Sequence, residues 1–404
     1  MNYINNKLSF DNKLIDSIAK KYGTPLYCYS FEKIKKNITS FKKNFKSFSP
    51  LICFAVKSNT NIKILKEIKK FNIGADVVSI GELMKALKAG IKPQKIVFSG
   101  VGKTAEEIEY AVTKNILLIN TESKSEILEI EKIAKKKRKI INIGIRLNPN
   151  TDAKTLSQIS TGKKENKFGV NQKIFLQLVN YLKDSKYLNL KCLSVHIGSQ
   201  ILNHKPYENM LKVIDKIISK SNHKFEYIDL GGGMGIDYEH NNSKLNLKKY
   251  SKNIQKFLKK NNSNIIFEPG RSIIGDTAIL VSQIIYIKDG FKKKFVILDS
   301  AMNDFMRPAL YNASHKIIPI RKNKIKSNKS YEFVGPICES TDKFSTIKKF
   351  QKLNEEEYIA ICDVGAYGTS LASNYNVRPK PMEILIKGLK IKVINKRQKL
   401  SEIM

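Results

Sequence analysis

The sequence predicts a (β/α)8 barrel joined to a second, mostly β domain. Three observations lead to this fold class: eight short apolar runs between residues 50 and 271, segments of helical period after seven of them, and a change of rhythm after about residue 275. Apolar strands that alternate with amphipathic helices are typical of parallel strands buried on both faces. Eight such units in roughly 220 residues fit a closed barrel.

The eight predicted strands lie at residues 51–56, 75–78, 95–98, 116–119, 141–147, 190–197, 225–230 and 265–267. The predicted helices lie at residues 62–70, 80–89, 105–113, 125–137, 172–182, 207–219 and 248–260. An open, doubly wound sheet is the alternative architecture. The connection at residues 149–169 is long and polar, which is typical either of a functional lid or of a surface excursion.

The chain of 404 residues suits two domains. We expect the barrel at residues 31–275, and a β domain formed by residues 1–30 together with residues 276–404. The β domain is predicted from short strands without long helices between them, at residues 24–30, 278–287, 294–298, 331–334, 358–362 and 382–386.

Composition excludes several classes of protein. No apolar run approaches the roughly 20 residues that cross a bilayer, and residues 1–13 lack the apolar segment of a signal peptide. We therefore expect a cytoplasmic protein without membrane contact. The five cysteines are scattered and form no CxxC, which argues against a disulfide framework and against a zinc site. We expect no bound metal.

The formal charge of +37 raises the question of nucleic-acid binding. Only seven of the 73 basic residues are arginine, whereas proteins that bind phosphate groups tend to favour the bidentate arginine fork. We interpret the excess charge as lysine on solvated surface, and we expect no nucleic-acid partner. Four of the seven arginines lie in distinctive local motifs: Arg146, Arg271, Arg307 and Arg378.

Chemically distinctive residues follow the predicted strands, where barrels carry their active sites. Lys57 ends the first strand, and a desolvated amine there suits Schiff-base chemistry, although a lysine extending to solvent is the alternative. The sixth strand ends in His196-Ile197-Gly198-Ser199. The seventh leads into glycines 231–233, which favour either an anion cradle or a tight turn. Glu268-Pro269-Gly270-Arg271 ends the eighth.

An amine, a histidine, a phosphate cradle and a carboxylate together suit pyridoxal phosphate. The sequence resembles the pyridoxal-phosphate decarboxylases of the alanine-racemase fold over essentially its whole length. The motifs that carry the resemblance are FAVKSN (54–59), GADVVSIGEL (74–83), FSGVGKT (98–104), ISTGKKENKFG (159–169), HIGSQ (196–200), GGGMGIDY (231–238), EPGRSI (268–273), MNDFMRPALY (302–311), VGPICESTD (334–342), GAYG (365–368) and YNVRP (375–379). Residues 156–158 depart from the family pattern.

The resemblance implies a role for each matching residue at the cofactor. Lys57 would carry pyridoxal 5'-phosphate as an internal aldimine, and His196 would stack on its ring. Glu268 would pair with the pyridinium nitrogen. The residues that would hold the phosphate and ring are Ser199, Gly231, Gly232, Gly233, Pro269, Gly270 and Arg271.

The resemblance also implies the substrate and an assembly. Cys338 would protonate the α-carbon after carbon dioxide leaves, and it would come from the partner subunit of a homodimer with shared sites. Arg271, Arg307 and Tyr311 would bind a substrate carboxylate, Glu339 the distal ammonium, and Tyr367 the cofactor or substrate. A substrate with a carboxylate and an ammonium group at its distal end fits meso-2,6-diaminopimelate. Its decarboxylation would give L-lysine, the last step of lysine biosynthesis.

Other readings remain open at the level of sequence. A related decarboxylase could act on D-lysine, D-ornithine or carboxynorspermidine, and an α-proton exchange without gas release would indicate a racemase. A non-catalytic carrier of pyridoxal phosphate is a further alternative, although such proteins are usually a single short barrel. The second domain with Cys338 favours the enzyme.

Overall fold

The computed structural model describes residues 1–153, 161–162 and 166–404. The segment 156–158, which departs from the family pattern, and with it much of the long polar connection at residues 149–169, lies outside the described residues. By internal packing the chain divides into two compact units, and each is described by itself. The barrel unit comprises residues 37–236 and 243–272, and the β unit comprises residues 1–36, 237–242 and 273–404.

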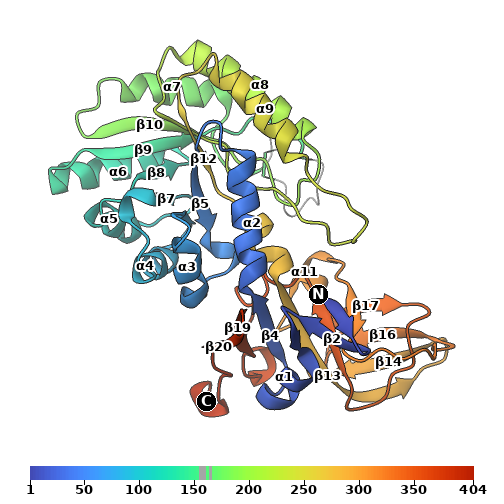
Figure 1. Ribbon diagram of the computed structural model, residues 1–404. Coiled ribbons are helices and arrows are strands. Elements are labelled where there is room, and N and C mark those ends of the chain that lie inside the picture. Colours follow the sequence, from blue (N-terminus) through green and yellow to red (C-terminus); the bar gives the residue numbers. More distant parts are fainter. Residues whose placement is uncertain (154–160, 163–165) are drawn as a thin grey trace. The chain divides into compact units, whose positions relative to one another are not determined.

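The barrel unit is built on eight parallel strands that close on themselves, in the order β10-β11-β12-β5-β6-β7-β8-β9 (Figure 1). Their bounds are β5 (Leu51–Ala55), β6 (Gly74–Val77), β7 (Ile96–Phe98), β8 (Leu118–Thr121), β9 (Ile141–Arg146), β10 (Leu188–Ser194), β11 (Tyr227–Asp229) and β12 (Asn264–Phe267). Parallel pairing of β12 with β5 closes the ring. The predicted barrel is therefore confirmed, and the open sheet is excluded.

Helices follow the strands and surround them (Figure 1). Their bounds are α2 (Phe31–Asn44), α3 (Ile62–Lys69), α4 (Ile80–Lys88), α5 (Ala105–Thr113), α6 (Lys124–Lys137), α7 (Gln172–Leu182), α8 (Lys205–Ser221), α9 (Leu247–Leu258) and α10 (Arg271–Ile274). Polar caps begin several of them: Ser79, Thr104 and Ser123 each accept a backbone N–H in the first turn. Such caps typically stabilise a helix by about 1 kcal/mol. None of the helices in the described ranges is long and apolar enough to span a bilayer.

The barrel interior is packed with apolar side chains. Cys53, Val97, Leu118, Cys192 and Ile266 form one buried cluster inside the ring, at most 1% exposed. Small and branched side chains of this kind fill barrels in layers and leave no pore.

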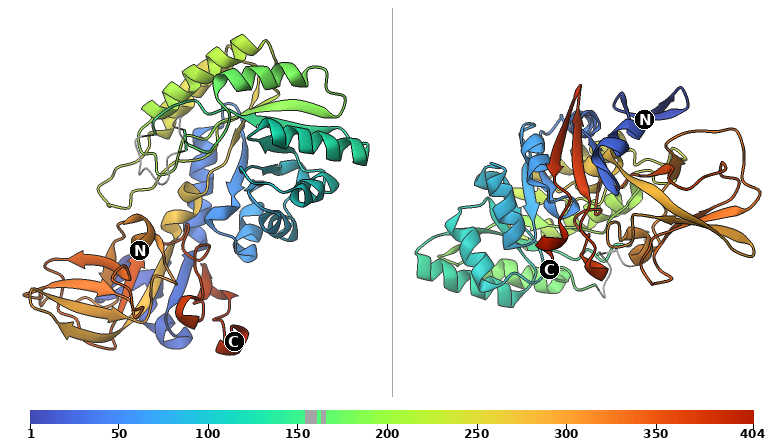
Figure 2. Two further views of the ribbon diagram at one scale, coloured as in Figure 1. Left: turned by 180° about the vertical axis from the view of Figure 1, so that it is seen from behind. Right: turned by 90° about the horizontal axis from the view of Figure 1, so that it is seen from below.

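The β unit contains a mixed nine-stranded sheet. A separate three-stranded sheet, β1-β2-β3, is formed by the first strands of the chain. The bounds are β1 (Asn2–Ile4), β2 (Lys7–Phe10), β3 (Lys13–Leu14), α1 (Ile15–Tyr22), β4 (Leu26–Ser30), β13 (Ala278–Asp289), β14 (Lys293–Leu298), α11 (Arg307–Tyr311), β15 (Ile317–Pro319), β16 (Ser330–Val334), β17 (Lys343–Ile347), β18 (Tyr358–Cys362), β19 (Met382–Lys387) and β20 (Lys390–Asn395). The N-terminal strand β4 pairs with β13 and β19, and Figure 2 shows it in blue among the orange and red C-terminal strands.

Candidate active site

Lys57 lies in a short 3-10 turn, Val56–Ser58, directly after β5. Its Nζ is 3.0 Å from Oδ2 of Asp76 on the neighbouring strand β6. The Asp76 carboxylate is completely buried, whereas the Lys57 side chain is 39% exposed. The amine therefore sits at the carboxyl end of the barrel, within reach of solvent and held by a buried anion.

Two further carboxyl groups lie close to this pair. Asp229 ends β11 and Glu268 follows β12, and both are buried. Burial raises the pKa of Asp229 to about 6. Burial, together with the charges of Asp229 and Asp76, holds the pKa of Glu268 well above its usual range. Such an arrangement of interacting acids is typical of functional sites.

His196 follows β10 and is enclosed by the same end of the barrel. The backbone N–H of Gly232 donates to its Nδ1 over 3.1 Å. Burial, with the cations of Arg146 and Lys57, holds the pKa of His196 well below its usual range. The ring is therefore neutral, with its proton on Nε2, and it offers a flat, uncharged face to a bound molecule.

The glycines after β11 allow a backbone approach that no larger residue permits. Gly231 and Gly233 have φ angles of +62° and +85°. A Cβ at Gly231 would lie 2.6 Å from Nδ1 of His196, and one at Gly233 would lie 2.2 Å from the carbonyl oxygen of Gly198. Backbone N–H groups of such a segment suit an anion, but those of Gly231 and Gly232 already donate to Oδ1 of Asp229 and Nδ1 of His196.

The segment 268–271 packs against the turn that carries Lys57. The Ala55 N–H donates to the carbonyl oxygen of Pro269 over 3.2 Å, and a Cβ at Gly270 would lie 2.9 Å from Ser58. Arg271 donates from Nη2 to Oγ of Ser199 over 3.2 Å. The structure thus gathers the ends of β5, β6, β10, β11 and β12 with their polar residues.

The remaining predicted site residues lie in the β unit. Arg307 and Tyr311 begin and end α11. Cys338 is the exposed one of the five cysteines, and the other four are buried. Glu339 accepts a hydrogen bond from the Tyr375 hydroxyl. Tyr367 adopts a left-handed backbone conformation with φ +57°.

Sequence reasoning missed several residues that contact the predicted ones. They are Asp76 beside Lys57, Asp229 beside Glu268 and His315 beside Arg307. Arg146, which the sequence marked only as an arginine in a distinctive motif, lies beside His196. A usable signal existed for His315, because the chain has only five histidines. Asp76 and Asp229 stand at the carboxyl ends of their strands, the position that barrels use for chemistry.

The residues at this end of the barrel fit pyridoxal phosphate. Glycines 231–233 lie so close to neighbouring protein atoms that no Cβ fits, and a backbone segment of this kind suits close approach to a phosphate group. Oδ1 of Asp76 and Oδ1 of Asn120 are buried and have no hydrogen-bond partner among the described residues. Buried acceptors without a donor are rare in folded proteins, so these two oxygens are consistent with a site that a bound molecule completes.

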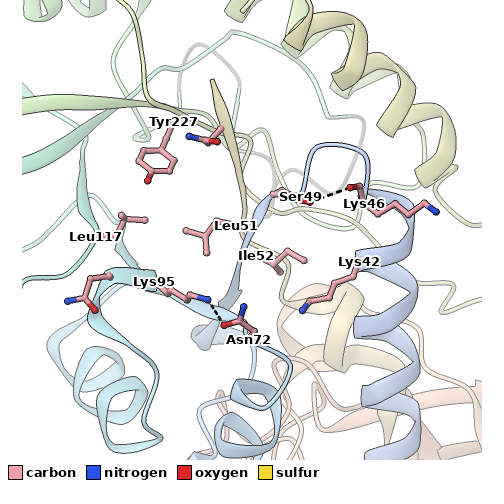
Figure 3. Close-up of a pocket in the computed structure, with 12 residues that line it drawn as sticks. Lys42, Lys46, Ser49, Leu51, Ile52, Asn72, Lys95, Leu117 and Tyr227 are labelled. Carbon is pink, nitrogen blue, oxygen red and sulfur yellow. Dashed lines mark hydrogen bonds between the residues drawn. The ribbon is translucent and has the colours of Figure 1, made fainter. Parts of the chain in front are cut away.

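The opposite end of the barrel contains a separate cavity of about 610 Å3. Figure 3 shows its lining residues, among them Leu51 and Tyr227 from the first positions of β5 and β11. Lys42 and Lys95 extend toward Asn72 at its edge. None of the twelve lining residues belongs to the predicted site, so this cavity is distinct from it.

Comparison with known proteins identifies the class to which this site belongs. Residues 31–275 match the family described as "Pyridoxal-dependent decarboxylase, pyridoxal binding domain". The chain belongs to this family of pyridoxal-dependent decarboxylases, and it is therefore an enzyme that uses pyridoxal phosphate.

The particular relatives are diaminopimelate decarboxylases. The chain is 43% identical to that of Helicobacter pylori over 392 residues, 96% of each chain, and 38% identical to that of Aquifex aeolicus over 98% of this chain and 95% of the relative. The crystal structure of the Helicobacter pylori enzyme complexed with L-lysine matches with a TM-score of 0.92 over 96% of this chain and 98% of that one. The M. jannaschii enzyme in co-complex with L-lysine matches with a TM-score of 0.93 at 34% identity, over 98% and 95%.

Proposed function

We propose that this enzyme removes carbon dioxide from meso-2,6-diaminopimelate and forms L-lysine, the last step of lysine biosynthesis. One structural observation carries the proposal: an amine at the end of the first barrel strand lies beside a buried cluster of three carboxyl groups, in a chain 43% identical to a diaminopimelate decarboxylase.

In this proposal the barrel unit holds the cofactor. Lys57 attaches it covalently, His196 lies against its ring, and Glu268 accepts the N–H of the ring nitrogen. Glycines 231–233, Ser199 and the segment 269–271 surround its phosphate. When bound, pyridoxal phosphate withdraws electrons from the α-carbon as the carboxylate leaves.

The chain's own groups then complete the reaction. A carboxylate at Glu268 favours a protonated ring nitrogen, which strengthens the electron withdrawal. Cys338 gives a proton to the α-carbon after carbon dioxide departs. Its exposed thiol within one chain suits a residue that acts in a neighbouring subunit, so we include a homodimer with shared sites in the proposal.

Specificity resides in the residues that bind the far end of the substrate. Arg271, Arg307 and Tyr311 bind its carboxylate, and Glu339 binds its ammonium group. Tyr367 contacts the cofactor or the substrate. A guanidinium can hold a carboxylate through two parallel hydrogen bonds, which distinguishes a carboxylate from a neutral group. We also propose that the enzyme is cytoplasmic.

The test of the reaction uses purified protein loaded with pyridoxal phosphate. With meso-diaminopimelate we expect equal amounts of L-lysine and carbon dioxide. D-Lysine, D-ornithine and carboxynorspermidine are assayed in parallel, and faster release of carbon dioxide from one of them would replace the proposed substrate.

The attachment of the cofactor is tested separately. Borohydride reduction of the loaded protein, followed by peptide mapping, should place the label on Lys57. The Lys57→Ala variant should remain unlabelled and inactive. A control variant, Lys92→Ala, changes an exposed lysine on the barrel and should keep both the label and the activity. A label on any other lysine would contradict the proposed site.

A further inference from the structure

A buried histidine, His315, holds the guanidinium of Arg307 in the β unit. Nη1 of Arg307 and Nε2 of His315 are 2.8 Å apart, and both residues are buried. On the other side of the ring, Nδ1 of His315 is 2.8 Å from the carbonyl oxygen of Cys362 at the end of β18. The imidazole therefore bridges the strand and α11.

These two contacts assign the tautomer of the imidazole. A carbonyl oxygen only accepts hydrogen bonds, so Nδ1 of His315 must carry the proton. A guanidinium only donates, so Nε2 must present its lone pair to Arg307. With one nitrogen donating and the other accepting, the ring is neutral. A hydrogen bond to a neutral ring orients a guanidinium without neutralising its charge.

Aromatic rings fix the imidazole in place. The ring centroids of Tyr238 and Phe305 lie 4.9 Å and 4.7 Å from that of His315, at interplanar angles of 67° and 85°. The guanidinium of Arg307 also lies over the ring of Tyr238, with Cζ of Arg307 4.6 Å from the ring centroid. The guanidinium of Arg307 thus contacts His315 through Nη1 at its edge and the ring of Tyr238 through its flat face.

Fixing an arginine matters for recognition. A free arginine side chain loses much conformational entropy when it is immobilised. If the protein has already ordered it, a ligand that binds the guanidinium does not bear this cost again. The bidentate geometry that selects a carboxylate also requires a fixed plane.

We propose that His315 is a positioning residue, which orients Arg307 and thereby sets the preference for a substrate with a distal carboxylate. This inference rests on the proposed function, in which Arg307 binds that carboxylate. His315 itself touches neither cofactor nor substrate in the proposal.

Two ligands isolate the effect. L-Lysine and 1,5-diaminopentane share both amines and the carbon chain, and they differ only in the carboxylate that the proposal assigns to Arg307. Binding of each to the loaded enzyme is followed by the absorbance of the cofactor. The wild-type enzyme should bind L-lysine more tightly, and equal affinities would contradict the proposed role of Arg307 before any variant is made.

Two variants then separate positioning from folding. Asparagine at 315 can place its amide N–H near the position of Nδ1, which preserves the donor to Cys362 but removes the acceptor for Arg307. Glutamine at 315 can place an oxygen near the position of Nε2 and preserves that acceptor. His315→Asn should weaken L-lysine binding by roughly 10- to 100-fold, as expected for a lost hydrogen bond to a charged group. Binding of 1,5-diaminopentane should change less than about twofold, and His315→Gln should restore much of the preference.

The matched control is His223→Asn, because Nε2 of His223 also contacts a carbonyl oxygen, that of Leu190, in the barrel unit. This variant should bind both ligands as the wild type does. The proposal is overturned if the folded His315→Asn enzyme keeps the full preference for L-lysine, or if both ligands weaken equally. Should His315→Asn fail to fold, His315→Leu takes its place because it also removes the acceptor for Arg307: preference lost in His315→Leu and retained in His315→Gln supports the proposal, and full preference in folded His315→Leu contradicts it.

Discussion

The carboxyl groups of Asp229 and Glu268 interact inside the barrel unit: burial and the charge of Asp229 hold the pKa of Glu268 well above its usual range. Two buried carboxylates near each other are unfavourable, so one of the pair favours its protonated form. Asp229 accepts from Nδ2 of Asn120 over 2.9 Å and from the N–H of Gly231 over 2.9 Å. These donors favour its ionised form, so Glu268 holds the proton when no ring faces it.

The first prediction concerns Asp229→Asn. The wild-type Glu268 must lose its proton before it can pair with a cationic ring, so cofactor affinity should fall as the pH decreases through the raised pKa of Glu268. Without the Asp229 charge this pKa moves down, and the variant should keep its affinity to lower pH. At pH values below the pKa of Glu268, lowering that pKa by one unit should raise the cofactor affinity about tenfold. Dissociation constants of pyridoxal phosphate from pH 5.5 to 8.5 measure the effect.

The control is Asp184→Asn, which changes an exposed carboxylate on the barrel surface. Its affinity profile should overlay that of the wild type. Superimposed profiles for wild type and Asp229→Asn would show that Asp229 does not set the protonation of Glu268.

The sequence predicted the barrel well because its elements are local. The predicted helix at residues 105–113 coincides with α5, where acidic residues follow Thr104 and apolar residues recur at helical spacing. Short elements were missed: β15 has three residues, too few for a period to appear. In the β unit, the strand predicted at residues 382–386 corresponds to β19, whereas β20, which follows after a two-residue turn and alternates polar and apolar residues, was not predicted.

The site divides in the same way. Lys57 and Glu268 belong to motifs of neighbouring residues, and such motifs are visible in one sequence. The residues that surround them come from other strands. Asn120 and Asp229, for example, are hydrogen-bonded to each other but lie 109 residues apart along the chain. Only closure of the barrel brings these positions together, and no periodicity encodes which side chains will then meet.

The second prediction concerns the ion pair of Arg146 and Glu122. Nη1 of Arg146 is 2.9 Å from Oε1 of Glu122, and the side chains are only 10% and 3% exposed. Glu122→Ala leaves a buried cation without this carboxylate, which should lower the free energy of unfolding by about 3–5 kcal/mol. Urea unfolding of the cofactor-free protein, followed by circular dichroism because the chain has no tryptophan, measures it.

The double variant Glu122→Leu/Arg146→Met serves as the comparison. It removes both charges and keeps apolar volume, so it should recover most of the lost stability. If the double variant is as unstable as Glu122→Ala, the loss comes from packing and not from the uncompensated charge.

The third prediction tests the shared sites of the proposed homodimer. Lys57→Ala and Cys338→Ala should each be nearly inactive, since they lack the attachment amine and the proton donor. After mixing and re-association, half of the dimers are hybrids in which one of two sites is intact. Activity should then return to about a quarter of the wild-type value, as the symmetry of a dimer dictates. No recovery in verified hybrids would place Cys338 in the site of its own subunit.

The fourth prediction concerns the pH dependence of stability. Burial raises the pKa of Asp304 in the β unit to about 7, from 3.8 in the unfolded chain. Because the folded state binds the proton more tightly, ionisation of Asp304 destabilises the fold progressively between about pH 4 and pH 7. Asp304→Asn cannot ionise and can still accept the N–H of Ala301. Its stability relative to wild type should therefore rise with pH, by at most about 1.4 kcal/mol per pH unit.

Melting temperatures of wild type and Asp304→Asn at half-unit steps from pH 4 to pH 8 give this difference. Any constant offset reflects the altered hydrogen bonds, and only the slope reports the titration. A difference that stays level across the window would mean that Asp304 is ionised throughout.

The fifth prediction concerns the glycine cradle. A Cβ at Gly233 would lie 2.2 Å from the carbonyl oxygen of Gly198. The backbone φ of Gly233 is +85°, a value that residues with a side chain rarely adopt. Gly233→Ala must shift this backbone, so binding of pyridoxal phosphate should weaken by about tenfold or more, given the roughly 1–2 kcal/mol cost of the left-handed conformation alone. Pyridoxal, which lacks the phosphate, should be affected much less. Gly102→Ala is the control, since a Cβ there meets nothing within 4 Å. Equal weakening of both ligands in Gly233→Ala would mean that the segment supports the ring or the fold and does not bind the phosphate.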